Sequence, residues 1–126
     1  MKSLAAARLY TFVDTAYLRG RAAAEVARQL CDCGSDLVQL RAKQASLDEI
    51  RRLAEEVLPV CERAGVRFVL NDHPRLALQL GAPVCHLGQE DFFDAGYRTA
   101  AQVTGCPPQM QLGLSTHAPK QAQRAL

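Results

Sequence analysis

The chain has 126 residues, of which 48% are hydrophobic and 22% charged, with 15 basic side chains against 13 acidic ones. This length fits one domain, and the composition excludes a disordered, collagen-like or coiled-coil chain. The net charge of +2 is too small to indicate a nucleic-acid partner or a membrane surface. The apolar runs are too short to span a bilayer. The five scattered cysteines favour reduced thiols and a cytoplasmic location over a disulfide framework.

Short apolar runs alternate with helical patterns along the chain. The strand predictions rest on β-branched and aromatic residues, and the helix predictions on apolar stripes that end at a glycine. Ser46 also has Glu49 three residues on, which is the spacing of a capping box at a helix start. In chain order we predict a strand at 9–13, a helix at 22–33, a strand at 36–41, a helix from Ser46 to Gly65, a strand at 66–70, a helix at 74–80, a strand at 84–87, a helix at 97–103, a strand at 110–114 and a helix from Pro119.

This alternation predicts βαβ units, and therefore an α/β domain with a parallel sheet and right-handed crossovers over residues 1–126. Five such units fit either an open doubly wound sheet or the first part of a (β/α)8 barrel. The turn after the first strand lacks the G-x-G-x-x-G pattern of dinucleotide-binding folds, and the chain has no P-loop.

Polar residues follow every predicted strand at its carboxyl end. Both architectures bind their ligands at these ends, so polar groups that converge there predict a site on one rim of the sheet. In strand order these residues are Asp14; Gln39, Arg41 and Lys43; Asn71 and Asp72; His86, Gln89, Glu90 and Asp91; and Ser115, Thr116 and His117.

Gln39, Arg41 and Lys43 alternate along the second strand, so on extended backbone all three side chains point the same way. A carboxamide and two cations on one wall suit phosphate or diphosphate oxygens, because Arg offers a rigid fork and Lys a compact charge. The alternative is a solvated strand end with two exposed basic residues.

Asp72 and Asp91 lie in consecutive loops after the third and fourth strands. Two carboxylates, together with water and substrate phosphate oxygens, are the usual ligands of Mg²⁺. Alternatively, Asp72 is an N-cap ahead of Pro74, and Asp91 lies in a solvated acidic loop. Combined with the nearby cations, the pair favours metal–diphosphate chemistry.

His86 and Ser115 end the fourth and fifth strands. A lone histidine at the end of an apolar strand is more often a packed rim residue than a catalytic one. The Ser115-Thr116-His117 run lacks the G-x-S-x-G elbow of a hydrolase. We therefore interpret Ser115 as a hydroxyl donor to phosphate, beside a helix N-terminus that favours anions.

Several segments together resemble the thiamine phosphate synthase family, in the order and at about the spacing of that family, over essentially the whole chain. Each segment alone is weakly specific, but the series QLRxK, ND and HLGQxD is highly specific jointly. The segments are Leu9-Tyr10, the run from Val38 to Lys43, Asn71-Asp72, Leu76-Ala77-Leu78 with Gly81-Ala82, the run from His86 to Asp91, and the run from Gly113 to His117.

The resemblance implies a (β/α)8 barrel and a transferase of thiamine biosynthesis. Such an enzyme condenses 4-amino-2-methyl-5-hydroxymethylpyrimidine diphosphate with thiazole phosphate, and it releases thiamine phosphate and pyrophosphate. The family reaction is understood as dissociative, so Arg41, Lys43 and Ser115 would serve catalysis by stabilising the leaving diphosphate. By position, Gln39, Arg41, Lys43, Asn71 and Ser115 would bind the pyrimidine diphosphate, and Asp72 and Asp91 would hold Mg²⁺.

The chain departs from the family in extent, since it holds about five of the eight strand–helix units. We therefore expect a fragment or truncated form without the later strands, which in the family carry the thiazole phosphate loops and a further lysine. One alternative is a thiazole tautomerase, although its members tend to lose the diphosphate and metal residues that this chain retains. Another is a non-catalytic partial-barrel remnant that forms a homo-oligomer through exposed sheet edges.

Overall fold

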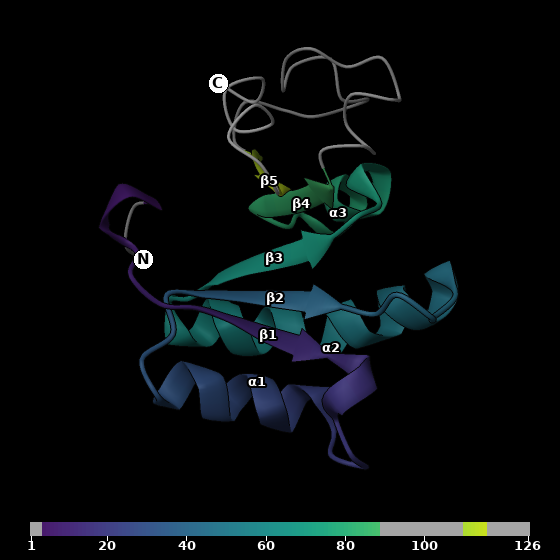
Figure 1. Ribbon diagram of the computed structural model, residues 1–126, viewed down its shortest axis with the longest axis horizontal. Helices are drawn as coiled ribbons and strands as arrows, with labels where there is room; N and C mark the ends of the chain where they lie inside the picture. Colours follow the sequence, from purple (N-terminus) through teal and green to yellow (C-terminus); the bar gives the residue numbers. More distant parts are fainter. Residues whose placement is uncertain (1–3, 89–109, 116–126) are drawn as a thin grey trace.

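The computed structural model describes residues 4–88 and 110–115. Strands and helices alternate along the chain, with short 3-10 turns before and after the first strand (Figure 1). In chain order the elements are η1 (Leu4–Ala6), β1 (Tyr10–Asp14), η2 (Thr15–Tyr17), α1 (Ala23–Asp32), β2 (Leu37–Arg41), α2 (Leu47–Ala64), β3 (Arg67–Asn71), α3 (Pro74–Leu80), β4 (Val84–Gly88) and β5 (Gln111–Ser115).

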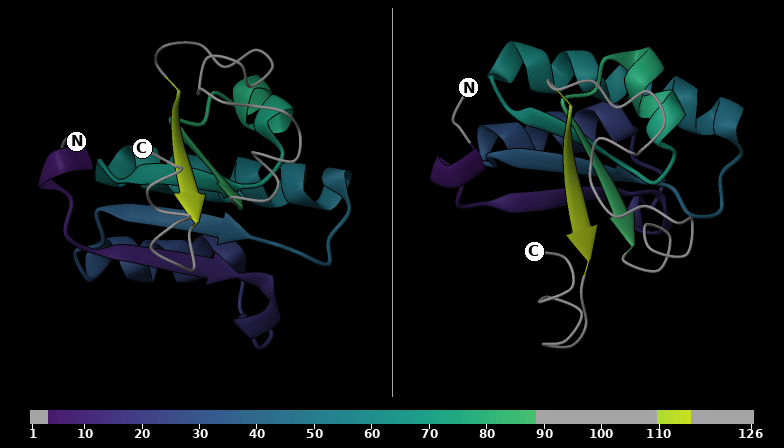
Figure 2. Two further views of the ribbon diagram at one scale, coloured as in Figure 1. Left: turned by 45° about the horizontal axis from the view of Figure 1, so that its top comes forward. Right: turned by 90° about the horizontal axis from the view of Figure 1, so that it is seen from above.

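The five strands form one parallel sheet in the order β1-β2-β3-β4-β5. The order follows the chain without the reversal that defines a doubly wound sheet. Helices α1, α2 and α3 all lie on the same face of the sheet (Figure 2). The parallel α/β prediction is therefore confirmed, and the doubly wound alternative is wrong.

The two faces of the sheet carry different side chains, because successive residues of a strand point to opposite sides. Residues facing the helices form the main hydrophobic core, which takes residues from all three helices. On the other face, Leu37, Val69 and Val84 form a smaller cluster closed by Leu4 and Ala7. The strand residues of the main core are Val13, Val38, Leu40, Phe68, Leu70, Cys85 and Leu87.

Helix α2 begins and ends at the residues that its sequence signals predict. The Ser46 hydroxyl accepts a hydrogen bond from the Glu49 backbone N–H at 3.2 Å, which satisfies a free donor of the first turn. Gly65 closes the helix with φ +70°, a left-handed conformation that glycine adopts without strain. Leu47, the first residue of α2, is 56% exposed although its spacing matches that of the buried residues of the helix.

Two predicted helices, at 97–103 and from Pro119, lie outside the described residues, as do Asp91, Cys106 and His117. The cysteines within the described ranges, Cys31, Cys33, Cys61 and Cys85, are in the thiol form and not in disulfides. In those same ranges, no helix combines the length and the apolar character needed to cross a membrane.

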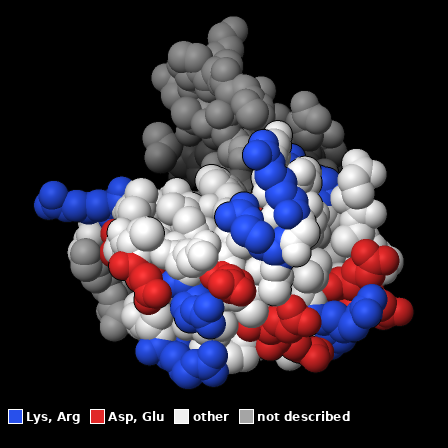
Figure 3. Space-filling model, turned by 90° about the horizontal axis from the view of Figure 1, so that it is seen from below, with Lys and Arg blue, Asp and Glu red and all other residues white. Residues whose placement is uncertain are grey.

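The surface charge is mixed on the side of the molecule where α1 lies. On the face seen in Figure 3, Lys and Arg side chains are interspersed with Asp and Glu side chains and form no extended patch of one sign. This distribution agrees with the small net charge of +2.

Candidate functional site

A cavity of about 380 Å³ opens at the carboxyl ends of the strands, on the face opposite the helices. All six described residues of the predicted site line this cavity, whereas Asp91 lies outside the described residues. The neighbouring strands run parallel, and alternate residues of each strand point to the same face of the sheet. The register between the strands therefore brings these residues together at one rim. The lining residues are Tyr10, Phe12, Gln39, Arg41, Lys43, Asn71, Asp72, His86, Gly88 and Ser115.

Gln39 is a buried polar residue on the cavity wall, with only 2% of its surface exposed. Its Nε2 donates a hydrogen bond to the Tyr10 hydroxyl at 2.7 Å. The Tyr10 ring stacks on Phe12 with ring centroids 5.2 Å apart. Burial raises the pKa of Tyr10, so the phenol stays neutral. The hydrogen bond to Tyr10 thus fixes the Gln39 amide on the cavity wall.

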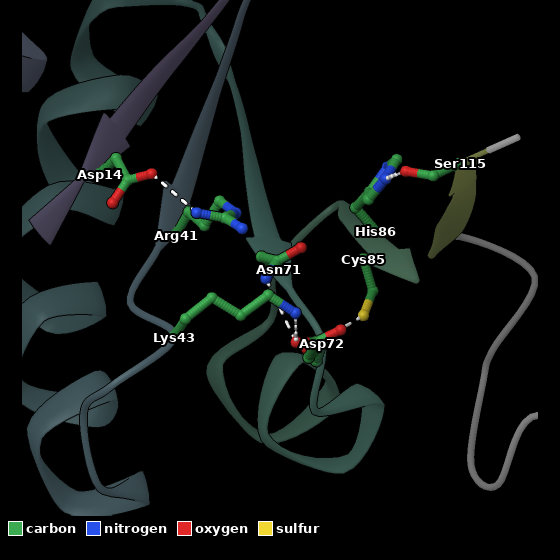
Figure 4. A network of polar contacts seen from close by, with 8 residues as sticks. All are labelled: Asp14, Arg41, Lys43, Asn71, Asp72, Cys85, His86 and Ser115. Atoms are coloured by element: carbon green, nitrogen blue, oxygen red, sulfur yellow. Dashed lines mark hydrogen bonds and ion pairs between the residues drawn. The ribbon is translucent and has the colours of Figure 1, made fainter. Parts of the chain in front are cut away.

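Arg41 is held in place by Asp14 on the neighbouring strand β1. The Arg41 Nη1 lies 2.9 Å from Oδ2 of Asp14, and the two residues are partners in the strand register (Figure 4). The other carboxylate oxygen of Asp14 accepts from the Ala16 backbone N–H at 2.9 Å, which anchors the carboxylate. One edge of the guanidinium is thus fixed, and within the described residues its remaining N–H groups have no other side-chain partner and can donate to an anion.

Lys43, Asn71 and Asp72 form the centre of the polar network. Oδ2 of Asp72 accepts from Lys43 Nζ at 2.9 Å and from Asn71 Nδ2 at 3.2 Å (Figure 4). Both contacts use the same oxygen, and no donor in the described part of the chain contacts Oδ1. Asp72 therefore presents one bound and one open carboxylate oxygen at the cavity.

The turn after β3 has an unusual backbone. Asp72 and His73 have φ of +63° and +56°, a left-handed conformation that non-glycine residues rarely adopt. The Asp72 backbone N–H donates to the His86 carbonyl at 2.7 Å, and the Cys85 thiol donates to the Asp72 carbonyl at 3.4 Å. His73, not Asp72, is the N-cap of α3, and it makes no side-chain cap bond. The N-cap interpretation of Asp72 is therefore wrong, because this turn directs its carboxylate to Lys43.

Asp72 is chemically suited to Mg²⁺, which is commonly bound through one or two carboxylates together with water and substrate phosphate oxygens. Its open oxygen Oδ1 lines the same cavity as Arg41 and Lys43, the cations placed to meet a phosphate. No group of three or more His, Cys, Asp or Glu side chains in residues 4–88 and 110–115 is arranged to enclose a metal ion. The described residues thus suit a metal ion that is coordinated by Asp72 and by the phosphate oxygens of a ligand together.

His86 and Ser115 close the cavity on the side of β4 and β5. The His86 Nε2 lies 2.5 Å from the Ser115 Oγ. Nδ1 is buried without a hydrogen-bond partner in the described residues. Burial lowers the pKa of His86, which favours the neutral imidazole.

Tyr10, Phe12 and Gly88 line the cavity but were not predicted as site residues from the sequence. The ion pair between Asp14 and Arg41 was not predicted either. The signal for Tyr10, Phe12 and Asp14 was their alternation along β1, which matches the alternation of Gln39 and Arg41 on β2. Only the strand register, however, places Asp14 beside Arg41.

Comparisons with known proteins identify the family of this chain. A model of the thiamine monophosphate synthase family matches residues 9–126. Thiamine-phosphate synthases of Lawsonia intracellularis and Pelotomaculum thermopropionicum are 34% and 36% identical over 95% and 99% of the chain. These alignments cover 53% and 55% of the relatives, so the chain spans about half their length.

The fold has a counterpart among solved structures. Thiamine phosphate pyrophosphorylase from Pyrococcus furiosus superposes with a TM-score of 0.74 at 19% identity. The superposition covers 94% of this chain and 54% of that protein, and at this identity it speaks for the fold alone. The family match and the curated relatives together establish that the chain belongs to the thiamine monophosphate synthase family.

Proposed function

We propose that this chain carries the pyrimidine diphosphate side of a thiamine phosphate synthase active site. In the proposed reaction, the C–O bond between the pyrimidine methylene and the diphosphate breaks, and the diphosphate leaves with the electron pair. The thiazole nitrogen then forms a C–N bond to the methylene carbon, which gives thiamine phosphate and pyrophosphate. The observation that carries this proposal is the gathering of an amide, two cations, a carboxylate and a hydroxyl around one cavity.

Each side chain has a role that follows from its chemistry. Arg41 and Lys43 would neutralise charge that builds on the leaving diphosphate, because preorganised cations cost no reorganisation at the moment of reaction. Gln39 and Asn71 would orient the pyrimidine diphosphate through their amides. Ser115 would donate a hydrogen bond to a diphosphate oxygen. These roles make Arg41, Lys43 and Ser115 the proposed catalytic residues.

Asp72 would hold Mg²⁺ through its open oxygen Oδ1, and Asp91 is proposed as the second carboxylate. When bound, the metal supplies positive charge to the diphosphate oxygens. Retention of Asp72 with both cations supports the synthase over the thiazole tautomerase, since neither a carboxylate–metal site nor a diphosphate wall serves tautomerisation.

The proposed fold is a (β/α)8 barrel, and residues 1–126 form part of this domain. The five parallel strands in chain order, with helices on one face, support this assignment. We also propose a cytoplasmic location, which the thiols Cys31, Cys33, Cys61 and Cys85 support because a reducing compartment preserves them.

We propose further that the chain forms a homo-oligomer through the edge of β1. Within the described sheet, β1 pairs on one side only, with β2. Aromatic surface is exposed on β1 and on the η2 turn that follows it, with Phe12 52% and Tyr17 68% exposed. Light scattering should give a dimer or larger assembly, and Phe12→Lys should shift it toward the monomer. A monomeric parent chain would contradict the assembly.

The proposed activity is tested by mixing the chain with both substrates and Mg²⁺ and measuring thiamine phosphate and pyrophosphate together. Because the chain carries the pyrimidine diphosphate side of the site, we expect it to bind the pyrimidine diphosphate in the presence of Mg²⁺, and any thiamine phosphate and pyrophosphate should form in equal amounts. Failure of the chain to form products, combined with failure to bind the pyrimidine diphosphate, would overturn the proposal. Binding without turnover would limit the chain to the binding half of the site.

A further inference from the structure

The His86 imidazole lies between two residues of the neighbouring strand β5. Its Nε2 contacts the Ser115 Oγ at 2.5 Å, whereas Nδ1 is buried and has no hydrogen-bond partner among the described residues. His86 and Gly113 are partners in the parallel register of β4 and β5. The two ring nitrogens therefore have opposite surroundings, and these surroundings determine which nitrogen carries the proton.

Gly113 lies directly in front of Nδ1. A Cβ atom added to Gly113 would be 2.7 Å from Nδ1 and 3.6 and 3.7 Å from Cγ and Cε1, the two ring carbons bonded to Nδ1. Both carbon distances are nearly equal, and both are much longer than the distance to Nδ1, so the position lies close to the ring plane, along the direction of the Nδ1 lone pair or hydrogen. The Cα–H bond that the Cβ would replace thus points at Nδ1.

This contact discriminates between the two neutral tautomers of His86. A hydrogen on Nδ1 would face the C–H of Gly113, so a buried donor would have no acceptor, which is costly. If Nδ1 instead carries a lone pair, this lone pair accepts a weak hydrogen bond from the Gly113 C–H, which is mildly favourable. The doubly protonated ring would also carry a hydrogen on Nδ1, facing the same C–H without an acceptor, so this contact disfavours the charged ring too.

We propose that His86 is a neutral imidazole protonated at Nε2, that it donates this hydrogen to Ser115, and that it thereby makes the Ser115 hydroxyl a donor toward the cavity. Oγ of Ser115 accepts from Nε2–H, and its own hydrogen is then free for a ligand. The ligand atom at Ser115 must be an acceptor, such as a phosphate oxygen. His86 is a positioning residue, and Gly113 sets its tautomer.

The proton placement is tested by long-range ¹H–¹⁵N correlation spectra of the free chain at pH 8. The chain has three histidines, so loss of one set of signals in His86→Gln assigns the ring. We expect the pattern of an Nε2-protonated ring, and the same pattern in Ser115→Ala, because Gly113 and not Ser115 excludes the proton from Nδ1. An Nδ1-protonated pattern in the parent chain would overturn the proposal.

Gly113→Ala provides a structural test of the same contact. A Cβ at 2.7 Å from Nδ1 is closer than such atoms pack, so the ring must move. We expect the His86 signals to shift and to lose the single Nε2-protonated pattern, while the urea unfolding transition shows that the variant remains folded. Unchanged His86 signals in a folded Gly113→Ala variant would contradict the proposed contact.

The consequence for binding rests on the proposed function and is measured separately, with inorganic pyrophosphate as the probe. Ser115→Ala should weaken pyrophosphate binding roughly tenfold, the size expected for one hydrogen bond to a charged acceptor. His86→Leu should weaken it as well, and His86→Gln should restore part of it because an amide N–H can replace Nε2–H. Equal binding by His86→Leu and the parent would overturn the positioning role.

The two measurements separate failure of this inference from failure of the proposed function. An Nδ1-protonated ring in a chain that binds pyrophosphate would overturn the inference and leave the proposed function standing. An Nε2-protonated ring in a chain that binds no pyrophosphate would support the proton placement and contradict the diphosphate-binding function.

Discussion

The Nζ atom of Lys43 lies 2.9 Å from Oδ2 of Asp72, so two residues proposed to bind oppositely charged partners are paired with each other. Their side chains are 46% and 24% exposed, and they come from the ends of adjacent strands β2 and β3. The pair keeps the free cavity close to electrical neutrality. A diphosphate that binds Lys43 would leave the negative charge of Asp72 without its partner, and a cation that binds Asp72 would leave the positive charge of Lys43 without its partner. We therefore expect the diphosphate and the cation to bind together.

Asp72→Asn tests this coupling. In the parent chain, Mg²⁺ should strengthen pyrophosphate binding, and the variant should lose this gain because an amide is a poor Mg²⁺ ligand. Without Mg²⁺, the variant should bind pyrophosphate up to roughly fivefold more tightly, since Lys43 is released from an ion pair worth up to about 1 kcal/mol. Isothermal titration calorimetry with and without Mg²⁺ measures both effects.

Asp32→Asn is the matched control, because Asp32 is an exposed residue at the C-terminal end of α1, at the opposite end of the sheet from the cavity. It should behave as the parent chain in both titrations. If Mg²⁺ strengthens pyrophosphate binding by Asp72→Asn as much as by the parent chain, Asp72 does not bind the metal.

Arg41→Lys keeps the charge but removes the planar fork that Asp14 orients. Pyrophosphate binding should weaken roughly tenfold, because a bidentate contact to the anion is reduced to a single point charge. The same substitution at Arg52, an exposed residue of α2, should leave binding unchanged. Equal affinities for the Arg41→Lys and Arg52→Lys variants would show that the guanidinium geometry is not used.

Ser46→Ala should destabilise the fold by about 1 kcal/mol without changing pyrophosphate binding, because Ser46 caps α2 and does not line the cavity. The difference is measured from urea unfolding curves. Ser46→Asp should retain most of the stability, since a carboxylate also accepts from the Glu49 N–H. A Ser46→Ala variant as stable as the parent would show that the cap contributes nothing.

Burial raises the pKa of the Cys61 thiol to about 12, well above the ordinary pKa of a cysteine thiol. The folded state thus holds this proton more tightly than the unfolded state does. This contribution to stability is complete below pH 9 and is lost as the pH rises from 9 toward 12. Urea unfolding between pH 8 and pH 10.5 should show a smaller loss of stability in Cys61→Ala than in the parent chain.

Thiol labelling provides an independent check on Cys61. Cys33 is exposed, whereas Cys61 has no exposed surface. Iodoacetamide at pH 8 should therefore modify Cys33 in the native chain long before Cys61. Comparable labelling rates at the two positions would contradict the buried, protonated state of Cys61.

The sequence predicts the sheet and the helices well because local signals determine them. The Ser46 capping box and the glycine at 65 define the ends of α2, and the alternation of Gln39 and Arg41 determines which side of β2 faces the cavity. These features depend on neighbours a few residues apart, which a single sequence contains.

The contacts inside the site could not be predicted in the same way. The Arg41–Asp14 and His86–Ser115 contacts depend on the register between strands, which long-range packing determines. The carboxylate of Asp72 reaches Lys43 through a turn with positive φ at a non-glycine residue, for which the sequence has no local signal. The polar residues at the strand ends therefore predict which rim of the sheet carries the site, but not which of these residues contact one another.

The most direct test of the account is to locate the bound pyrimidine diphosphate by amide chemical-shift mapping in the presence of Mg²⁺. We predict that the largest changes occur at Gln39, Arg41, Lys43, Asn71 and Ser115, and that they diminish when Mg²⁺ is removed. Changes confined to a different cavity, which lies between α2 and α3 and is lined by Arg51, His73 and Gln79, would contradict this placement.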